Sequence, residues 1–72
     1  MHVKLKEFLE LIRTDEIITI YDPIENQYYQ EEICKENVEE KYLHYKVIGV
    51  NTNYDDSYNA VLEIDVFEII NH

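Results

Sequence analysis

Residues 30–46, with the sequence QEEICKENVEEKYLHYK, concentrate the side chains that most often do chemistry in proteins. They contain five glutamates, the only cysteine and one of the three histidines. Such a set can hold a metal ion, supply an acid and a base for catalysis, or form an acidic surface for a basic partner. The rest of the sequence ranks these three interpretations.

A zinc site would use Cys34 and His44. Cys34 ends one predicted strand and His44 begins the next, so a short helix between them would bring the thiol and the imidazole together. His2 and His72, near the two ends of the chain, would complete the shell. The spacing matches no zinc signature, and single Cys and His residues usually serve packing or surface roles. We therefore predict no cofactor and keep a small zinc-containing regulatory or assembly protein as an alternative.

A calcium loop is only partly present in residues 51–62. Asn51, Asn53 and Asp55 stand at positions 1, 3 and 5 of a loop like that of an EF-hand. Position 6 is Asp56 instead of glycine, and position 12 is Leu62 instead of the bidentate glutamate. Asn and Asp side chains favour turns by bonding to the nearby backbone, so we expect a turn without an ion.

Catalysis lacks the residues that it needs. Ser57, the only serine, has no histidine near it in the sequence, and the acidic neighbours of Cys34 disfavour its nucleophilic thiolate form. Adjacent glutamates in a strand, such as Glu31 and Glu32, point to opposite faces and do not converge on one reacting centre. Gly49, the only glycine, lies inside a strand pattern, which predicts a bulge or close packing and not a phosphate-binding loop. We predict that the chain is not an enzyme.

The charge balance favours the third interpretation. The 72 residues suit one domain, 1–72, and carry a net charge of -10 with 46% apolar residues, which indicates a folded acidic protein. Residues 1–13 have three cationic and two acidic side chains, a net of +1, so the other 59 residues hold a net of -11. Nucleic acids and anionic membranes are therefore poor ligands, whereas basic protein surfaces are good ones.

The compartment is inferred from what the chain lacks. A single cysteine cannot form an internal disulfide, and the N-terminal sequence MHVKLKEFLELIR has no secretory apolar region or cleavage site. No stretch approaches the roughly 18 apolar residues of a membrane span. We expect a cytoplasmic protein.

Seven tyrosines accompany two phenylalanines and no tryptophan. Several are expected to line the edge of a small core with their hydroxyls in water. Tyrosine set among carboxylates is also a good protein-binding surface, and Tyr54 and Tyr58 flank the acidic pair Asp55 and Asp56. We predict binding by Tyr54, by Tyr58 and by either Tyr28 or Tyr29, since only one of that adjacent pair can face solvent from a strand.

The periodicity of apolar residues predicts the elements. Leu5, Phe8, Leu9 and Ile12 are spaced to share one helix face, which predicts a helix from residue 3 or 4 to residue 13. Strands are expected at residues 16–22, 27–34, 44–52 and 59–70.

A second, short helix is expected over residues 38–43, because Asn37 followed by Glu40 is a capping-box variant. The order is α-β-β-α-β-β, which predicts an α+β fold with an antiparallel four-stranded sheet and two helices on one face. If the apolar run at residues 66–70 lies at a sheet edge, it could pair in a homodimeric structural subunit, a further alternative.

The opening sequence VKLKEFLELIRTDEIITIYDP, an amphipathic helix followed by a strand that ends in Tyr-Asp, resembles small acidic proteins of phages and mobile elements of Gram-positive bacteria. Some of these are type II anti-CRISPR proteins, which inhibit Cas9. The resemblance implies a non-enzymatic inhibitor in the cytoplasm of a bacterial host. It would block nucleic-acid loading by a Cas9-type effector, either as a DNA mimic or by docking elsewhere, because such effectors hold nucleic acid in basic channels.

The leading hypothesis is thus an acidic protein that binds a basic, nucleic-acid-binding protein. Its predicted partner-binding residues are Glu31, Glu32, Glu36, Glu39, Glu40, Tyr54, Asp55, Asp56 and Tyr58.

Overall fold

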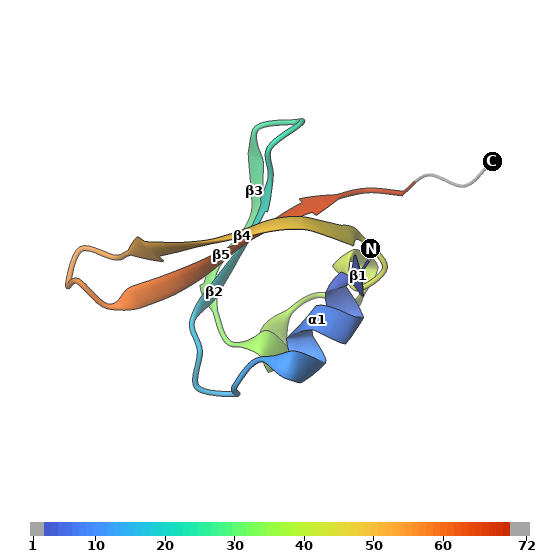
Figure 1. Cartoon of the computed structure of the whole chain (residues 1–72). Helices are drawn as coiled ribbons and strands as arrows, with labels where there is room; N and C mark the ends of the chain where they lie inside the picture. Colours follow the sequence, from blue (N-terminus) through green and yellow to red (C-terminus); the bar gives the residue numbers. More distant parts are fainter. Residues whose placement is uncertain (1–2, 70–72) are drawn as a thin grey trace.

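Five strands and one α-helix make up the fold of the computed structural model, which describes residues 3–69 (Figure 1). The elements in chain order are β1 (Val3–Lys4), α1 (Leu5–Leu11), β2 (Ile18–Asp22), β3 (Gln27–Ile33), β4 (Lys46–Tyr54) and β5 (Ala60–Phe67). Two single 3-10 turns, Lys35–Asn37 and Glu40–Tyr42, connect β3 to β4. The α+β class is confirmed, but the predicted number of strands and helices is wrong.

The sheet has the order β1-β4-β5-β2-β3 and is mixed. The hairpins β2–β3 and β4–β5 are antiparallel as predicted, but they join through a parallel pair between β2 and β5. The sheet is therefore not fully antiparallel, because the connection between the hairpins crosses over one face of the sheet before β4 begins (Figure 1). The fifth strand, β1, was expected to be the start of the helix and pairs with residues 46–47 of β4.

The predicted second helix does not form. Its expected start, Asn37, makes no side-chain cap, and only the two 3-10 turns are present. Gln30 of β3 supplies the partners instead: its side-chain amide donates to the carbonyl of Asn37 at 3.1 Å, and its side-chain oxygen accepts from the N–H of Glu39 at 2.9 Å. Because a strand side chain satisfies this backbone, the segment needs no helical hydrogen bonds.

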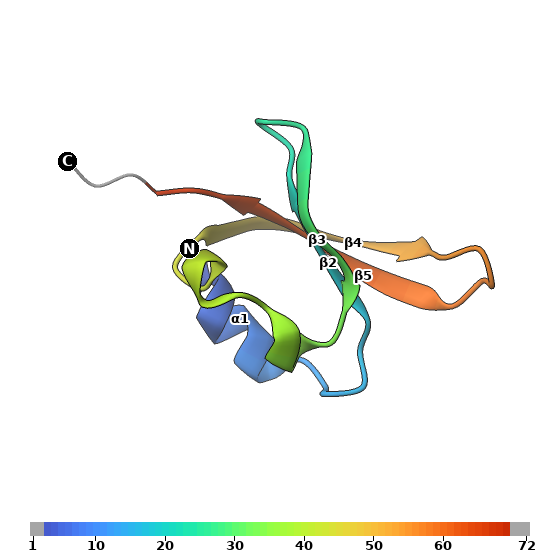
Figure 2. The same cartoon turned by 180° about the vertical axis from the view of Figure 1, so that it is seen from behind.

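Helix α1 is shorter than predicted and ends at Leu11. Lys35 in the first 3-10 turn donates to the carbonyls of Leu9 and Ile12, at 2.9 and 2.8 Å. This cation caps the negative end of the helix, where the last carbonyls lack helical partners. The contact also fixes the first 3-10 turn against the C-terminal end of α1 (Figure 2).

The core lies between α1 and the sheet. Its fully buried residues are Leu5, Ile18, Ile20, Ile64 and Val66. A cluster of three tyrosines extends it beneath the 3-10 turns: the ring of Tyr29 stacks on that of Tyr42 with centroids 4.8 Å apart, and Tyr45 meets both rings edge-on. Three of the seven tyrosines therefore serve the core, as predicted for several of them.

Asp22 is the buried carboxylate of this cluster, with 3% of its surface exposed. It accepts from the Tyr29 hydroxyl at 2.6 Å and from the backbone N–H groups of Ile24 and Glu25 at 2.9 and 3.1 Å. Burial by itself raises the pKa of Asp22, but these three hydrogen bonds outweigh burial and hold the pKa below its ordinary value. The carboxylate thus joins the β2–β3 turn to the core.

Gly49 lies next to a bulge, as predicted. The pairing of β4 with β5 shifts register between Val47 and Gly49. A Cβ at residue 49 would lie 3.3 Å from a side-chain oxygen of Asp65, which is tighter than an ordinary van der Waals contact. Because Gly49 has no Cβ, the Asp65 side chain can pack against β4 at this position.

Candidate protein-binding face

The face of the sheet that points away from α1, here called the outer face, is covered by no other element of residues 3–69 (Figures 1 and 2). Alternation along β5 turns Leu62, Ile64 and Val66 toward the helix and Glu63 and Asp65 to the outer face. The outer face therefore carries the two carboxylates of β5.

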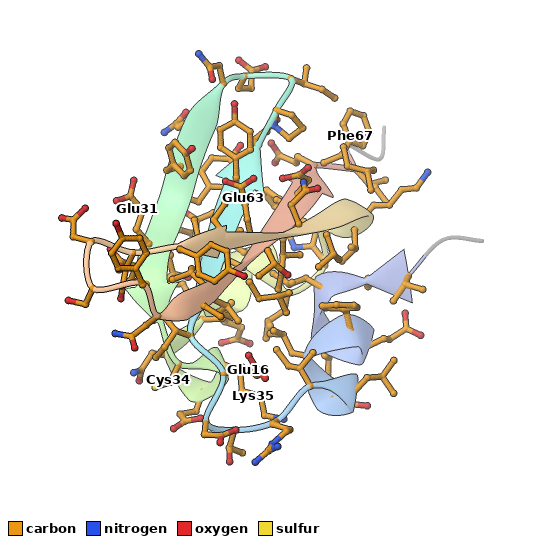
Figure 3. The ribbon with its side chains drawn as sticks, turned by 60° about the vertical axis from the view of Figure 1, so that its left-hand side comes forward. Glu16, Glu31, Cys34, Lys35, Glu63 and Phe67 are labelled. Carbon is orange, nitrogen blue, oxygen red and sulfur yellow. The ribbon has the colours of Figure 1, made fainter. Side chains whose placement is uncertain are left out.

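An open groove of about 490 Å³, here called the acidic groove, lies on the outer face between β3 and the β4–β5 turn. Glu31 of β3 and Glu63 of β5 both line it (Figure 3). The lining residues are Thr19, Tyr28, Glu31, Glu32, Asn53, Tyr54, Asp55, Asp56, Ser57, Val61 and Glu63. Five of them carry carboxylates and none is lysine or arginine, so the groove concentrates negative potential.

Glu31 and Glu32 both reach the groove, although adjacent strand residues were expected to diverge. The pairing of β2 with β3 is irregular between Ile18 and Ile20, and Glu32 has a positive φ of 51°. The hydroxyl of Thr19 accepts the N–H of Glu32 at 3.2 Å and holds this irregular backbone. The bulge removes strict alternation, so both residues line the same groove.

The turn that closes the groove is organised by Asp55. Its side chain accepts from the N–H groups of Ser57 and Asn59, each at 2.9 Å, and from the Asn59 side chain at 3.3 Å. The Asn59 backbone bond is the main cause that lowers the pKa of Asp55. Asp55 therefore builds the turn, as expected for this loop, and Asp56 is the freer carboxylate.

Tyrosines surround the acidic groove. Tyr28 faces solvent while Tyr29 points into the core, in agreement with strand alternation. The hydroxyl of Tyr28 lies near the Glu63 carboxylate, whose negative charge raises the pKa of Tyr28. Tyr54 lines the groove with 68% of its surface exposed, and Tyr58 stands on the turn with 87% exposed. These rings offer rigid contact area next to charge.

Glu36, Glu39 and Glu40 do not join the acidic groove. Glu36 and Glu40 belong to the 3-10 turns and Glu39 lies between them, on the helix side of the sheet (Figure 2). Glu39 forms an exposed ion pair with Lys41 at 3.3 Å. The predicted acidic surface is therefore divided between two faces of the molecule.

Cys34 and His44 do not meet. Cys34 precedes the 3-10 turn whose Lys35 caps the C-terminal end of α1, whereas His44 lies between Leu43 and Tyr45, whose carbonyls accept from the first N–H groups of α1. Seven helical residues at about 1.5 Å each separate these ends, so the expected convergence is wrong. Within residues 3–69 no three Cys, His, Asp or Glu side chains cluster as metal ligands. The other suggested ligands, His2 and His72, lie outside the described residues.

Tyr28 is the member of the predicted pair Tyr28 or Tyr29 that lines the groove, whereas Glu63 was not among the predicted binding residues. Alternation in the sequence assigns Glu63 to the polar side of its strand, which was the available signal. Its place beside β2 and near β3 depends on the parallel pairing of β5 with β2, which no local pattern reveals.

No family model, curated protein or solved structure matches this chain. No helix in the described residues is long and apolar enough to span a membrane.

Proposed function

We propose that this chain is a non-enzymatic acidic protein that inhibits a basic, nucleic-acid-binding protein by occupying its cationic surface through the acidic groove. The observation that carries the proposal is the groove itself, in which five carboxylates and two tyrosines gather on an uncovered sheet face with no cation among them. Lysine and arginine side chains of a partner would enter this negative potential and stack on the tyrosine rings.

The resemblance to anti-CRISPR proteins makes a Cas9-type effector, in the cytoplasm of a bacterial host, the proposed partner. Such effectors hold guide and target in positively charged channels. An inhibitor with the acidic groove would compete for that channel as a DNA mimic, or block nucleic-acid loading from a neighbouring basic site.

The experiment measures affinity for a purified Cas9-type effector as a function of salt and of groove charge. The groove variant Glu31→Gln, Asp56→Asn, Glu63→Gln removes three charges without touching Asp55, which builds the turn. Its affinity should fall by about tenfold or more, because charge pairs in an interface commonly contribute at least this much.

A matched control removes the same charge elsewhere. The variant Glu10→Gln, Glu36→Gln, Glu40→Gln changes three exposed carboxylates outside the groove and should lose much less affinity. Wild-type binding should weaken steeply as salt rises. Equal losses in the two variants, or an affinity that salt does not change, would refute the groove as the binding surface.

A further inference from the structure

The edge of β4 that faces away from β5 is the least protected strand edge of the described sheet. One side of β4 pairs with β5 along its length, whereas the other side meets only the two residues of β1, opposite Lys46 and Val47. Within residues 3–69, nothing pairs with residues 48–54 on that side. This stretch has unpaired backbone groups available to another strand.

The two sheet edges differ in how they resist pairing. The β3 edge carries Glu31 and Glu32 and two register irregularities, features that protect edges from a second strand. Residues 47–54 of β4, with the sequence VIGVNTNY, have no charged side chain, although the chain as a whole has a net charge of -10. Their pairing with a second strand would bury no charge.

The side chains of this edge are also unusually exposed for apolar residues. Ile48 and Val50 are 46% and 41% exposed. Val50 is paired with Ile64 and therefore lies on the helix side of the sheet. On the same side, Thr52 lines a groove with Leu11 at the end of α1, which is 80% exposed. This shallow groove of about 390 Å³ continues the apolar surface. A strand added to β4 would cover part of it.

The charges at the two ends of β4 are opposite. Lys46 at its start stands across from Lys4 of β1, and two like charges opposite each other destabilise a strand pair. Neither lysine has an ion-pair partner in the described part of the chain. Beyond the other end of β4 lie Asp55 and Asp56. An antiparallel two-fold arrangement of β4 strands would bring each acidic end toward the basic end of its partner.

We propose that β4 pairs antiparallel with β4 of a second copy of this chain, to form a symmetric dimer with one continuous sheet. Pairing is centred near Asn51 or Thr52, since β1 occupies the edge beside residues 46–47. Val50 and Thr52 of the two copies then form cross-strand contacts on the helix side. Glu31 and Glu63 of the acidic groove lie on β3 and β5, away from this edge, so the argument for the dimer does not rest on the proposed inhibitory function.

This interface replaces the one expected from residues 66–70. Strand β5 lies between β4 and β2, with residues 62–65 paired on both sides and residues 66–67 paired with β4, so it is an inner strand and not the edge of the sheet. Residues 68 and 69 follow the strand, and residue 70 lies outside the described residues.

Solution mass across a concentration series tests the dimer. The wild type should dimerise, and Val50→Lys should weaken dimerisation by about tenfold or more, since an inward-facing charge blocks edge pairing. Ile24→Lys is the matched control: Ile24 is 61% exposed in the remote β2–β3 turn, and its variant should dimerise like the wild type. Circular dichroism of each variant verifies the fold. A wild type that stays monomeric up to millimolar concentration, or a folded Val50→Lys that still dimerises like the wild type, overturns the proposal.

A charge exchange tests the antiparallel orientation. Lys4→Glu alone and Asp56→Lys alone should each weaken the dimer. Each places like charges at both ends of the interface, where residue 4 of one copy lies toward residue 56 of the other. The double variant restores opposite charges and should recover dimerisation. Failure of the double variant to recover, with its fold intact, overturns the antiparallel pairing.

Discussion

The hydrogen bond from Tyr29 to Asp22 should contribute a large part of the stability of this small protein. Tyr29→Phe keeps the aromatic ring that stacks on Tyr42 and removes only the hydroxyl. The change leaves one oxygen of Asp22, a side chain that is 3% exposed, without its donor. Hydrogen bonds to charged groups contribute about 1.5–3 kcal/mol, and an unsatisfied buried acceptor is costly. We expect a loss of about 2 kcal/mol in the free energy of unfolding.

That loss is a substantial fraction of the total, since a core of this size supplies about 3–5 kcal/mol. For a domain of this length it corresponds to a decrease of about 8–16 °C in Tm. Urea unfolding followed by circular dichroism measures it directly, and the slope with urea should not change. Tyr28→Phe is the matched control, because the adjacent Tyr28 is half exposed on the outer face, and its variant should unfold like the wild type.

The pH dependence identifies the bond as the cause. The pKa of Asp22 is lowered in the folded state, so the stability from its charged form is present above pH 3.8 and is lost as pH falls through the folded pKa. The pKa of Tyr29 is raised above 10.0 by the bond to Asp22 and by burial, so its contribution is complete below pH 10 and is lost as pH rises further.

The stability difference between wild type and Tyr29→Phe should therefore be constant from about pH 5 to 9 and shrink at both extremes. A difference below about 0.5 kcal/mol at neutral pH, or one that stays unchanged at pH values well below 3.8, would refute the reasoning.

Two further substitutions test other contacts. Lys35→Met should lower the free energy of unfolding by about 1–2 kcal/mol in urea titrations, because the cation that caps α1 is lost. Lys41→Met is the control and should change the free energy of unfolding little, since Lys41 forms only an exposed ion pair with Glu39. Equal effects of the two substitutions would contradict the cap. Burial raises the pKa of Asp65, whose Oδ1 has no hydrogen-bond partner, so its charge reduces folded-state stability and that loss grows as pH rises through the pKa. Asp65→Asn should thus raise Tm at pH 7 and lose this advantage below pH 3.8, and an unchanged Tm at pH 7 would contradict it.

Local patterns predicted the parts of the fold that depend on local physics. The spacing of Leu5 and Leu9 located α1, and Asp22-Pro23 located the turn of the β2–β3 hairpin. The capping pair Asn37 and Glu40 predicted a helix that does not form. The side chain of Gln30, in strand β3, makes the backbone hydrogen bonds that a helix would otherwise have made.

The candidate site was predicted only in part for a related reason. Acidic composition selected Glu31, Asp55 and Asp56, which do line one groove, but also Glu36 and Glu40, which lie on the other side of the sheet. A run of charges in sequence does not state which face each charge occupies when the chain turns irregularly between strands.

The sequence by itself determined a small acidic α+β domain with two hairpins, because composition, apolar period and turn residues act over a few positions. Tertiary structure decided that β5 lies beside β2, that Glu63 joins Glu31 across the acidic groove, and that Cys34 and His44 stay at opposite ends of α1. These outcomes depend on how two hairpins pack under one helix. Such non-local pairing is selected by burial of the whole core, and no short stretch of residues contains that information.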